Sequence, residues 1–361
     1  MNVNEFIRNA NLAKDESKLR ELIKVGEYIL KHCGENEKGK VLGTLGNIHF
    51  QLKNFDEAEK YYLDALQFYI NLSNEDLANI RFVSACLHNL GNLYQARKKY
   101  DEAIKSYSDA LKTLEYSNDH QLRLSTLIAL GTLHAKIGNL HECEENLREA
   151  LEIAERIGDE DKFITVLNNL AFLYLKLKKK NEAKILLKKA MNLIDKGDFK
   201  AAPILQNLLN LVDDSEFNSI VVKLEKLNLP YDLKAKVNYI KAKRLERTDK
   251  DLAAENYIKA GCFSFLAYRV LGLQSVNFIY CFERAMTLSS SLYEDAKFLR
   301  DVIAKVYLGL NFDFNPRCKL AGALRDYIKS GKITIDEPIS DVIRIVAGDA
   351  RAELADLNAN L

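Results

Sequence analysis

The chain repeats one pattern of apolar and small residues four times. In each copy a Leu is followed by Gly or Ala, another Leu stands three residues earlier, and an aromatic residue stands four residues later. A small residue follows twelve positions after the Gly or Ala, and an Ala seven positions after that. A pattern of this length indicates a repeat array in which each copy buries its apolar face against the next. The copies are centred on Leu45, Leu90, Leu130 and Leu170.

Each copy predicts a hairpin of two helices. The spacing puts the two Leu residues and the aromatic residue on one face of a first helix, and the Gly or Ala lets a second helix approach closely. Acidic pairs at 56–57 and 101–102 suit the start of a second helix, because the helix dipole favours negative charge there. No proline occurs in the first 202 residues, so helices can run unbroken. The bulky residues of the second helices are Tyr62, Tyr107, Leu147 and Leu187.

The segments LGNIHFQLKNFDEAEKYYLDAL (45–66) and LGNLYQARKKYDEAIKSYSDAL (90–111) resemble tetratricopeptide repeats. The Trp slot of that family holds Leu here, and the Pro that closes a repeat is absent. The period of about 40 residues exceeds the usual length of about 34, which is closer to the long-helix repeats of kinesin light chains and Pins-type polarity proteins. The resemblance implies an all-α fold: a right-handed superhelical solenoid of helix hairpins, followed by a C-terminal helical module.

We expect four parts along the chain. Residues 1–38 form a degenerate N-terminal hairpin that caps the array, and residues 39–198 hold the four repeats. Residues 199–262 contain linking helices, interrupted at prolines, and a degenerate repeat. Residues 263–361 form the helical module, whose last helix caps the apolar end of the array. The sequence has a strand signal only near Lys332–Asp336, where Ile alternates with polar residues.

Composition limits the partners that the chain can attract. The 52 Lys and Arg residues balance 51 Asp and Glu residues, so no global charge draws the chain to nucleic acid or to an anionic membrane. No window approaches the ~20 apolar residues of a membrane span, and the N-terminus lacks the features of a signal peptide. We therefore expect a cytoplasmic protein that does not bind membranes. The six cysteines form no Cys-x-x-Cys pair and are expected to be reduced, buried thiols.

No sequence motif predicts catalysis. His49 and His134 occupy the aromatic slot of the first helix, where they are expected to pack in the core. None of the strings typical of zinc proteases, phosphate-binding loops or serine hydrolases occurs. We expect no catalytic residue, no metal site and no cofactor.

The resemblance implies a binding groove lined by the first helices, in which asparagine recurs. An Asn amide offers a donor and an acceptor, so we expect these side chains to face solvent and to pair with the backbone of an extended peptide. The row is interrupted in the third repeat by Ala129 and Thr132. In the alternative interpretation, the Asn side chains serve contacts between helices. The predicted groove residues are Lys40, Asn47, Gln51, His88, Asn89, Asn92, Gln95, Thr132, Lys136, Asn168, Asn169, Phe172 and Lys176.

The function that these features predict is a scaffold or adaptor that binds a protein or peptide partner. Lys136 and Lys176, with His88 nearby, favour an acidic segment or a C-terminal carboxylate. One alternative is a peptide-responsive regulator that switches the C-terminal module. Another is an RNA-associated scaffold that uses the Lys-rich runs 171–198 and 234–250, although nucleic acid is the less favoured partner. The last helix could equally bind another copy, so a homo-oligomer is also possible.

Overall fold

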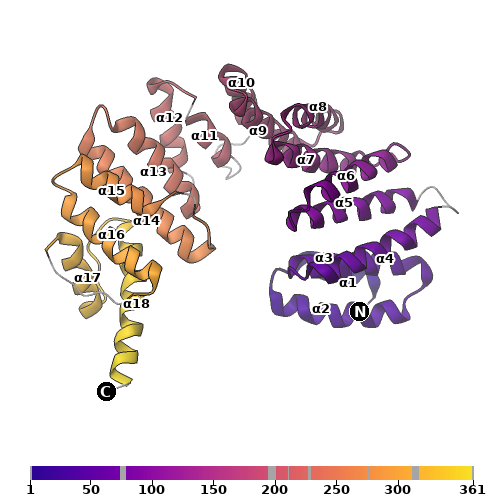
Figure 1. Ribbon diagram of the computed structural model, residues 1–361, viewed down its shortest axis with the longest axis horizontal. Helices are drawn as coiled ribbons and strands as arrows, with labels where there is room; N and C mark the ends of the chain where they lie inside the picture. The colour runs from indigo at the N-terminus through magenta and orange to yellow at the C-terminus, as the bar shows by residue number, and fades with distance from the viewer. Residues whose placement is uncertain are drawn as a thin grey trace. The chain divides into compact units, whose positions relative to one another are not determined.

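The computed structural model describes residues 2–73, 79–193, 201–209, 211–226, 229–274, 276–310 and 317–359. These residues form eighteen α-helices and no strand, which confirms the all-α prediction. Contacts divide the chain into two compact units, unit 1 at residues 1–193 and unit 2 at residues 194–361 (Figure 1).

Unit 1 is a stack of five helix hairpins, coloured indigo to magenta in Figure 1. Within each hairpin the two helices pack together, and each hairpin also contacts the next one in the chain. The four predicted repeats form the second to fifth hairpins. The helices are α1 (Val3–Leu12), α2 (Glu16–His32), α3 (Glu35–Gln51), α4 (Phe55–Ser73), α5 (Ile80–Ala96), α6 (Tyr100–Leu114), α7 (His120–Ile137), α8 (Leu140–Ile157), α9 (Glu160–Lys176) and α10 (Lys180–Asn192).

Small residues set the spacing inside the hairpins. A Cβ atom at Gly46 or Gly91 would lie 2.5 Å from a ring carbon of Tyr62 or Tyr107, respectively, so only glycine admits the ring at this distance. The small residues of the second helices are fully buried, as the repeat pattern predicts. They are Ala58, Ala65, Ala103, Ala110, Cys143, Ala150, Ala183 and Ala190.

The turn inside each repeat uses a residue with left-handed backbone. Three of these residues are lysines, and the third repeat has Gly138 instead. The amide of the following residue donates to the carbonyl oxygen of the aromatic slot, for example from Lys99 to Tyr94 at 2.9 Å. This bond closes the end of the first helix and turns the chain into the second. The lysines are Lys53, Lys98 and Lys178, with φ of 59°, 60° and 61°.

Unit 2 packs around α14 (Lys250–Leu271), in which Phe265 contacts Phe278 of the following helix, and Phe282 belongs to the same core. Gly261 allows close helix packing as the repeat glycines do, because a Cβ at this position would lie 2.8 Å from the Phe282 ring. The helices are α11 (Ala201–Leu209), α12 (Asp214–Glu225), α13 (Tyr231–Leu245), α14 (Lys250–Leu271), α15 (Phe278–Leu288), α16 (Tyr293–Leu308), α17 (Lys319–Ser330) and α18 (Ile339–Ala359).

Three details of unit 2 differ from the sequence expectations. Residues 332–336 form no strand; Ile333 and Ile335 instead pack against the unit 2 core from an irregular segment. Pro203 does not interrupt a helix, because it lies in the first turn of α11, where no intrahelical bond is lost. The proposed boundary after residue 262 lies inside α14, and one core spans both sides of it.

The first half of the last helix, α18, packs into the core of unit 2. Val342, Ile343, Val346 and Ala347 of its first half are buried in the unit 2 core. Ala350 and Leu354, which the helical spacing of apolar residues also places on this face, have side chains outside the described residues.

We expect Gly91→Ala to lower the free energy of unfolding by about 1–3 kcal/mol, because the added methyl group overlaps the Tyr107 ring. Gly43→Ala is the matched control in a first helix. A Cβ at Gly43 meets nothing within 4 Å, so this change should stabilise the protein by about 0.5–1 kcal/mol through helix propensity. Urea denaturation followed by circular dichroism measures both. Equal stability of the two variants would contradict the close packing of Gly91 on Tyr107.

Candidate functional site

The predicted groove residues lie on the first helices of the repeats, α3, α5, α7 and α9. Helix α5 contacts α7, and α7 contacts α9, so these helices form a continuous surface of unit 1. We call this surface, which carries the thirteen predicted residues, the first-helix face.

Two of the asparagines on this face are bound to tyrosines, which corrects the expectation that they face solvent. The Tyr62 hydroxyl donates to Asn47 Oδ1 at 2.8 Å, and the Tyr107 hydroxyl donates to Asn92 Oδ1 at 2.6 Å. Both tyrosines are buried, so each phenol needs an acceptor inside the hairpin. In these two repeats Asn therefore holds the second helix, and only its remaining hydrogen-bonding groups are left for a ligand.

The side-chain amides of Asn89 and Gln95 also make contacts within unit 1. Asn89 Nδ2 donates to Asn47 Oδ1 at 3.4 Å, which links the first and second repeats. Gln95 Oε1 lies 3.2 Å from the Tyr107 hydroxyl. The interpretation that amides serve contacts between helices therefore holds for part of the predicted set.

The third and fourth repeats differ, because Leu147 and Leu187 replace the two tyrosines. Leucine has no hydroxyl to satisfy, and the first-helix residues at the Asn position are Thr132 and Phe172. A hollow of about 450 Å³ opens between α7 and α9 at this place. We call it the α7–α9 pocket. It is lined by Thr132, Ala135, Lys136, Leu147, Asn169, Phe172 and Lys176.

The pocket combines an apolar surface with available polar groups. Phe172 is 49% exposed, although it is a large apolar side chain on the face of a packed array. Asn169 makes no side-chain hydrogen bond within the part of the chain that the structure describes, so its amide can pair with a ligand. The Thr132 hydroxyl donates to the Ala129 carbonyl at 2.9 Å and keeps its oxygen as an acceptor.

The two pocket lysines lie at its edge. Lys176 Nζ donates to the Ala135 carbonyl at 2.9 Å and lies 5.1 Å from the centre of the Phe172 ring. Lys136 Nζ lies 5.1 Å from the centre of the Tyr100 ring. Among the described residues neither lysine forms an ion pair, so both positive charges remain uncompensated.

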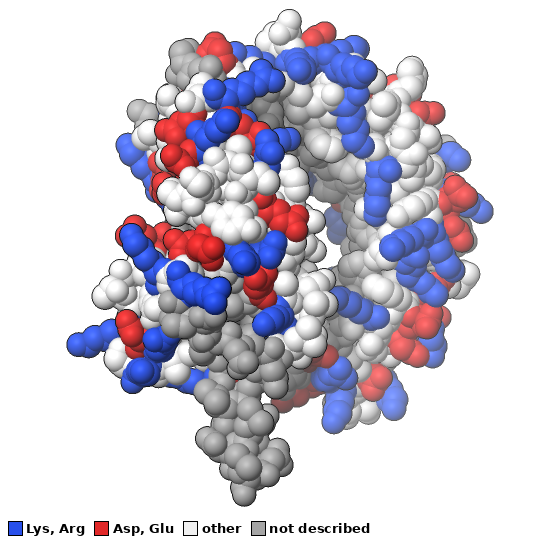
Figure 2. All heavy atoms as spheres, turned by 60° about the vertical axis from the view of Figure 1, so that its left-hand side comes forward, with Lys and Arg blue, Asp and Glu red and all other residues white. Residues whose placement is uncertain are grey.

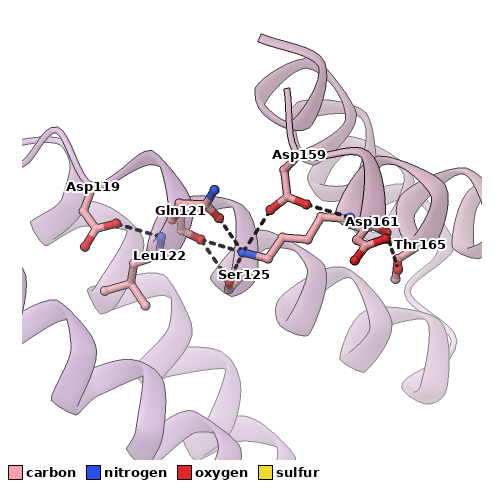
Figure 3. A network of polar contacts seen from close by, with 8 residues as sticks. Asp119, Gln121, Leu122, Ser125, Asp159, Asp161 and Thr165 are labelled. Atoms are coloured by element: carbon pink, nitrogen blue, oxygen red, sulfur yellow. Dashed lines mark hydrogen bonds and ion pairs between the residues drawn. The ribbon is translucent and has the colours of Figure 1, made fainter. Parts of the chain in front are cut away.

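A polar network links α7 and α9 near the starts of these helices (Figure 3). Lys162, in the first turn of α9, reaches α7, where Nζ lies 2.7 Å from Gln121 Oε1 and 3.0 Å from Ser125 Oγ. Asp159 caps α9 and lies 3.7 Å from the same ammonium group. The repeat pattern does not reveal Lys162, because the equivalent positions in the other repeats are Glu37, Phe82 and Leu122.

His88 ties α5 to α7 on the same face. Its Nδ1 lies 3.0 Å from Thr126 Oγ1, and Thr126 donates its own hydrogen to the Leu122 carbonyl, so His88 Nδ1–H is the donor. Burial and the nearby Lys162 charge lower the pKa of His88 to about 4. His88 is therefore neutral at pH 7 and adds no positive charge to the groove.

The remaining predicted residues are dispersed. Lys40 and Gln51 are exposed on α3, and neither lines the pocket. Asn168 is half-buried beside Asn169. The structure therefore brings Thr132, Lys136, Asn169, Phe172 and Lys176 together, and these five residues line the α7–α9 pocket.

His88 predicts a pH dependence of stability. Its folded-state pKa of about 4 lies below the unfolded value of about 6.5, so the unfolded chain binds a proton more readily than the folded chain. The stability that neutral His88 allows is therefore complete above pH 6.5, and it is lost as the pH falls toward 4. We expect the free energy of unfolding to fall by about 2–3 kcal/mol more in the native chain than in His88→Gln between pH 7 and pH 4. Urea titrations at both pH values measure the difference. An identical pH dependence in the variant would show that His88 is not held neutral by the fold.

The described residues offer neither a metal-binding group nor a membrane-spanning helix. In the described ranges, no group of three or more His, Cys, Asp or Glu side chains could hold a metal ion. No helix in those ranges has both the length and the apolar character needed to cross a bilayer. On the face drawn in Figure 2, basic and acidic side chains are interspersed. All six cysteines are free thiols, and four of them are buried.

The tetratricopeptide-repeat family matches this chain in three overlapping segments, residues 37–115, 82–155 and 122–196. Among solved structures, the apo form of RapI is similar, with a TM-score of 0.54 and 16% identity over 78% of this chain and 99% of that chain. The apo form of the quorum sensor NprR from B. thuringiensis has a TM-score of 0.58 and 14% identity, over 84% of this chain and 86% of that chain. No curated protein sequence matches significantly.

At these identities the similarity to solved structures concerns the fold alone. The family match, however, covers the segment in which four copies of the pattern form four stacked hairpins. The repeat sequence, its structure and the family match therefore agree that residues 37–196 of this chain are an array of tetratricopeptide repeats.

Proposed function

We propose that this protein is an interaction scaffold that binds a peptide segment of a protein partner at the α7–α9 pocket. The observation that carries the proposal is the pocket itself. Five predicted groove residues meet there, and the tyrosine that fills the equivalent space in the first two repeats is replaced by Leu147.

The pocket offers the two kinds of contact that a peptide needs. An apolar side chain of the ligand would cover Phe172 and Leu147, and burying such surface contributes about 25 cal/mol per Å². The Asn169 amide can pair with a peptide group of the ligand on both its donor and its acceptor side. These contacts favour an extended segment with an apolar residue at the pocket.

The charge at the pocket edge favours an acidic segment. Lys136 and Lys176 have no carboxylate partner among the described residues, and the neutral state of His88 leaves the lysines as the groups that would attract an anion. A carboxylate beside the apolar residue of the ligand would lie within reach of either ammonium group. Positive groups at the rim of a binding site chiefly raise the association rate and select the partner.

The same binding event would suit either of two roles. A scaffold holds its partner without changing its own structure, whereas a regulator transmits the binding to unit 2. The similarity to the quorum sensor NprR extends over both units, but it shows the fold alone. Hydrogen exchange of unit 2 with and without a unit 1 ligand separates these roles, since only a regulator changes the protection of helices that the ligand does not touch.

A suitable probe is a fluorescein-labelled peptide of sequence Gly-Glu-Leu-Glu-Gly, compared with Gly-Gln-Leu-Gln-Gly. We expect the double variant Lys136→Glu and Lys176→Glu to weaken binding of the acidic peptide at the α7–α9 pocket about tenfold or more, because two attractive charges become repulsive. Fluorescence anisotropy at low and at physiological salt measures the effect.

The matched control reverses Lys24 and Lys105, which are exposed on α2 and α6, outside the first-helix face. This control changes the net charge by the same amount and should leave the affinity within about twofold at physiological salt. If the two double variants lost the same amount of affinity for the acidic peptide, net charge rather than the pocket would govern binding.

A second test fills the pocket with the residues of the second repeat. In Leu147→Tyr with Thr132→Asn, the new phenol can lie over Gly131 and donate to the new Asn, as Tyr107 does with Gly91 and Asn92. We expect the melting temperature to stay within a few degrees of the native value, because the pair reproduces a packing that the chain already uses. Peptide binding at this pocket should be lost. Unchanged binding in a folded variant would rule out the pocket as the binding site.

A further inference from the structure

Unit 2 has a larger hollow than the pocket in unit 1. Its volume is about 770 Å³, and it lies between α11, α13 and the start of α15. We call it the α13 pocket, because most of its lining comes from that helix. A volume of this size is typical of sites that bind drug-sized ligands or short peptide segments.

Positive charge dominates this lining. Lys236, Lys243 and Arg244 face the pocket, and none of the described residues that line it is acidic. Arg244 is committed to the fold, since its guanidinium donates to the carbonyls of Leu209 and Val212 at the end of α11. Lys243 forms no ion pair within the described ranges and lies 5.5 Å from the centre of the Tyr239 ring.

Two acids lie near the pocket. Glu246 is bound by Arg284 and by the Tyr257 hydroxyl, and the Arg284 hydrogen bond lowers the pKa of Glu246 to about 2. Asp232 forms an ion pair with Lys236 at 3.9 Å, one helical turn away on α13. An anion that enters the pocket therefore meets Lys243 without an ion-pair partner among the described residues, and it competes with Asp232 for Lys236.

Neutral donors add to the lysines. The hydroxyls of Tyr239 and Tyr280 have no hydrogen-bond partner in the part of the chain that the structure describes, and the Tyr280 side chain is exposed. The rings of the two tyrosines lie 6.4 Å apart and provide apolar surface beside the charges. Ile240 and Val276 extend that surface.

We propose that the α13 pocket is a second binding site, which takes an acidic peptide segment with two carboxylates on either side of an apolar residue. Lys236 and Lys243 are two helical turns apart, which is about 10 Å along α13. Carboxylates two residues apart on an extended peptide are about 7 Å apart, and the flexible lysine stems cover the difference. In an extended peptide the residue between the two carboxylates points to the opposite face, so its apolar side chain turns away from the two lysines, toward Val276 and Tyr280 at the start of α15. This site lies wholly in unit 2 and does not depend on the α7–α9 pocket.

The test uses the full chain and the acidic pentapeptide Gly-Glu-Leu-Glu-Gly in isothermal titration calorimetry. In the double variant Lys236→Glu and Lys243→Glu, the affinity of the unit 2 site for the acidic peptide should fall about tenfold or more. On the native chain, the Gln-containing peptide should bind that site as weakly as the acidic peptide binds the variant. The control reverses Lys319 and Lys329, which are exposed on α17 and outside the pocket, and it should bind as the native chain does.

The two sites can be told apart in the same experiment. Reversal of Lys136 and Lys176 should leave the α13 pocket active, and reversal of Lys236 and Lys243 should leave the α7–α9 pocket active. A chain that loses all binding on reversal of Lys136 and Lys176 alone would overturn the second site and keep the first.

A measurement on the native chain tests the α13 pocket without relying on the folding of a variant. At saturating acidic peptide, amide hydrogen exchange should slow in residues 236–244 and 276–280. If exchange there is unchanged while the peptide is bound, the proposal is wrong. If a nucleotide or inorganic phosphate protects these residues and the peptide does not, the site serves a phosphate-bearing ligand and the peptide proposal is again wrong.

Discussion

The structure depends on one contact, the packing of a bulky second-helix side chain on a glycine of the first helix. In the first two repeats the ring of Tyr62 or Tyr107 lies on Gly46 or Gly91, and any side chain at the glycine would collide with it. This contact sets the distance between the helices of a hairpin, and the hairpins then stack at regular intervals. Unit 2 uses the same kind of contact, although its sequence no longer matches the repeat.

The chemistry of the bulky residue controls the surface above it. A buried tyrosine hydroxyl requires an acceptor, and Asn on the first helix supplies it in the first two repeats. Leu147 removes that requirement, so the third and fourth repeats can place Thr132 and Phe172 there and leave a hollow between their helices. The difference between a structural repeat and a candidate binding repeat thus lies in two positions, the bulky residue of the second helix and the first-helix residue that faces it.

Most of the fold follows from the sequence, because the repeat spacing, the small residues and the absence of proline act locally and recur. The roles of the asparagines could not be read in the same way. Whether Asn92 faces solvent depends on where the Tyr107 hydroxyl lies, and that partner is fifteen residues away on another helix. The repeat pattern also could not predict the left-handed backbone of the turn lysines, because that depends on local backbone geometry. Nor could it predict the contact of Lys162 with Gln121, because that partner lies in a neighbouring repeat.

The bonds from His88 to Thr126 and from Lys162 to Gln121 and Ser125 all join consecutive first helices. These hydrogen bonds link neighbouring hairpins on the first-helix face. Any bending of unit 1 that separates the first helices would have to break or lengthen them. A surface braced in this way loses little conformational entropy when a peptide settles on it, so more of the contact energy is left for affinity. In the proposed binding mode, the stiffness of the first helices would therefore contribute to affinity through residues that do not touch the ligand.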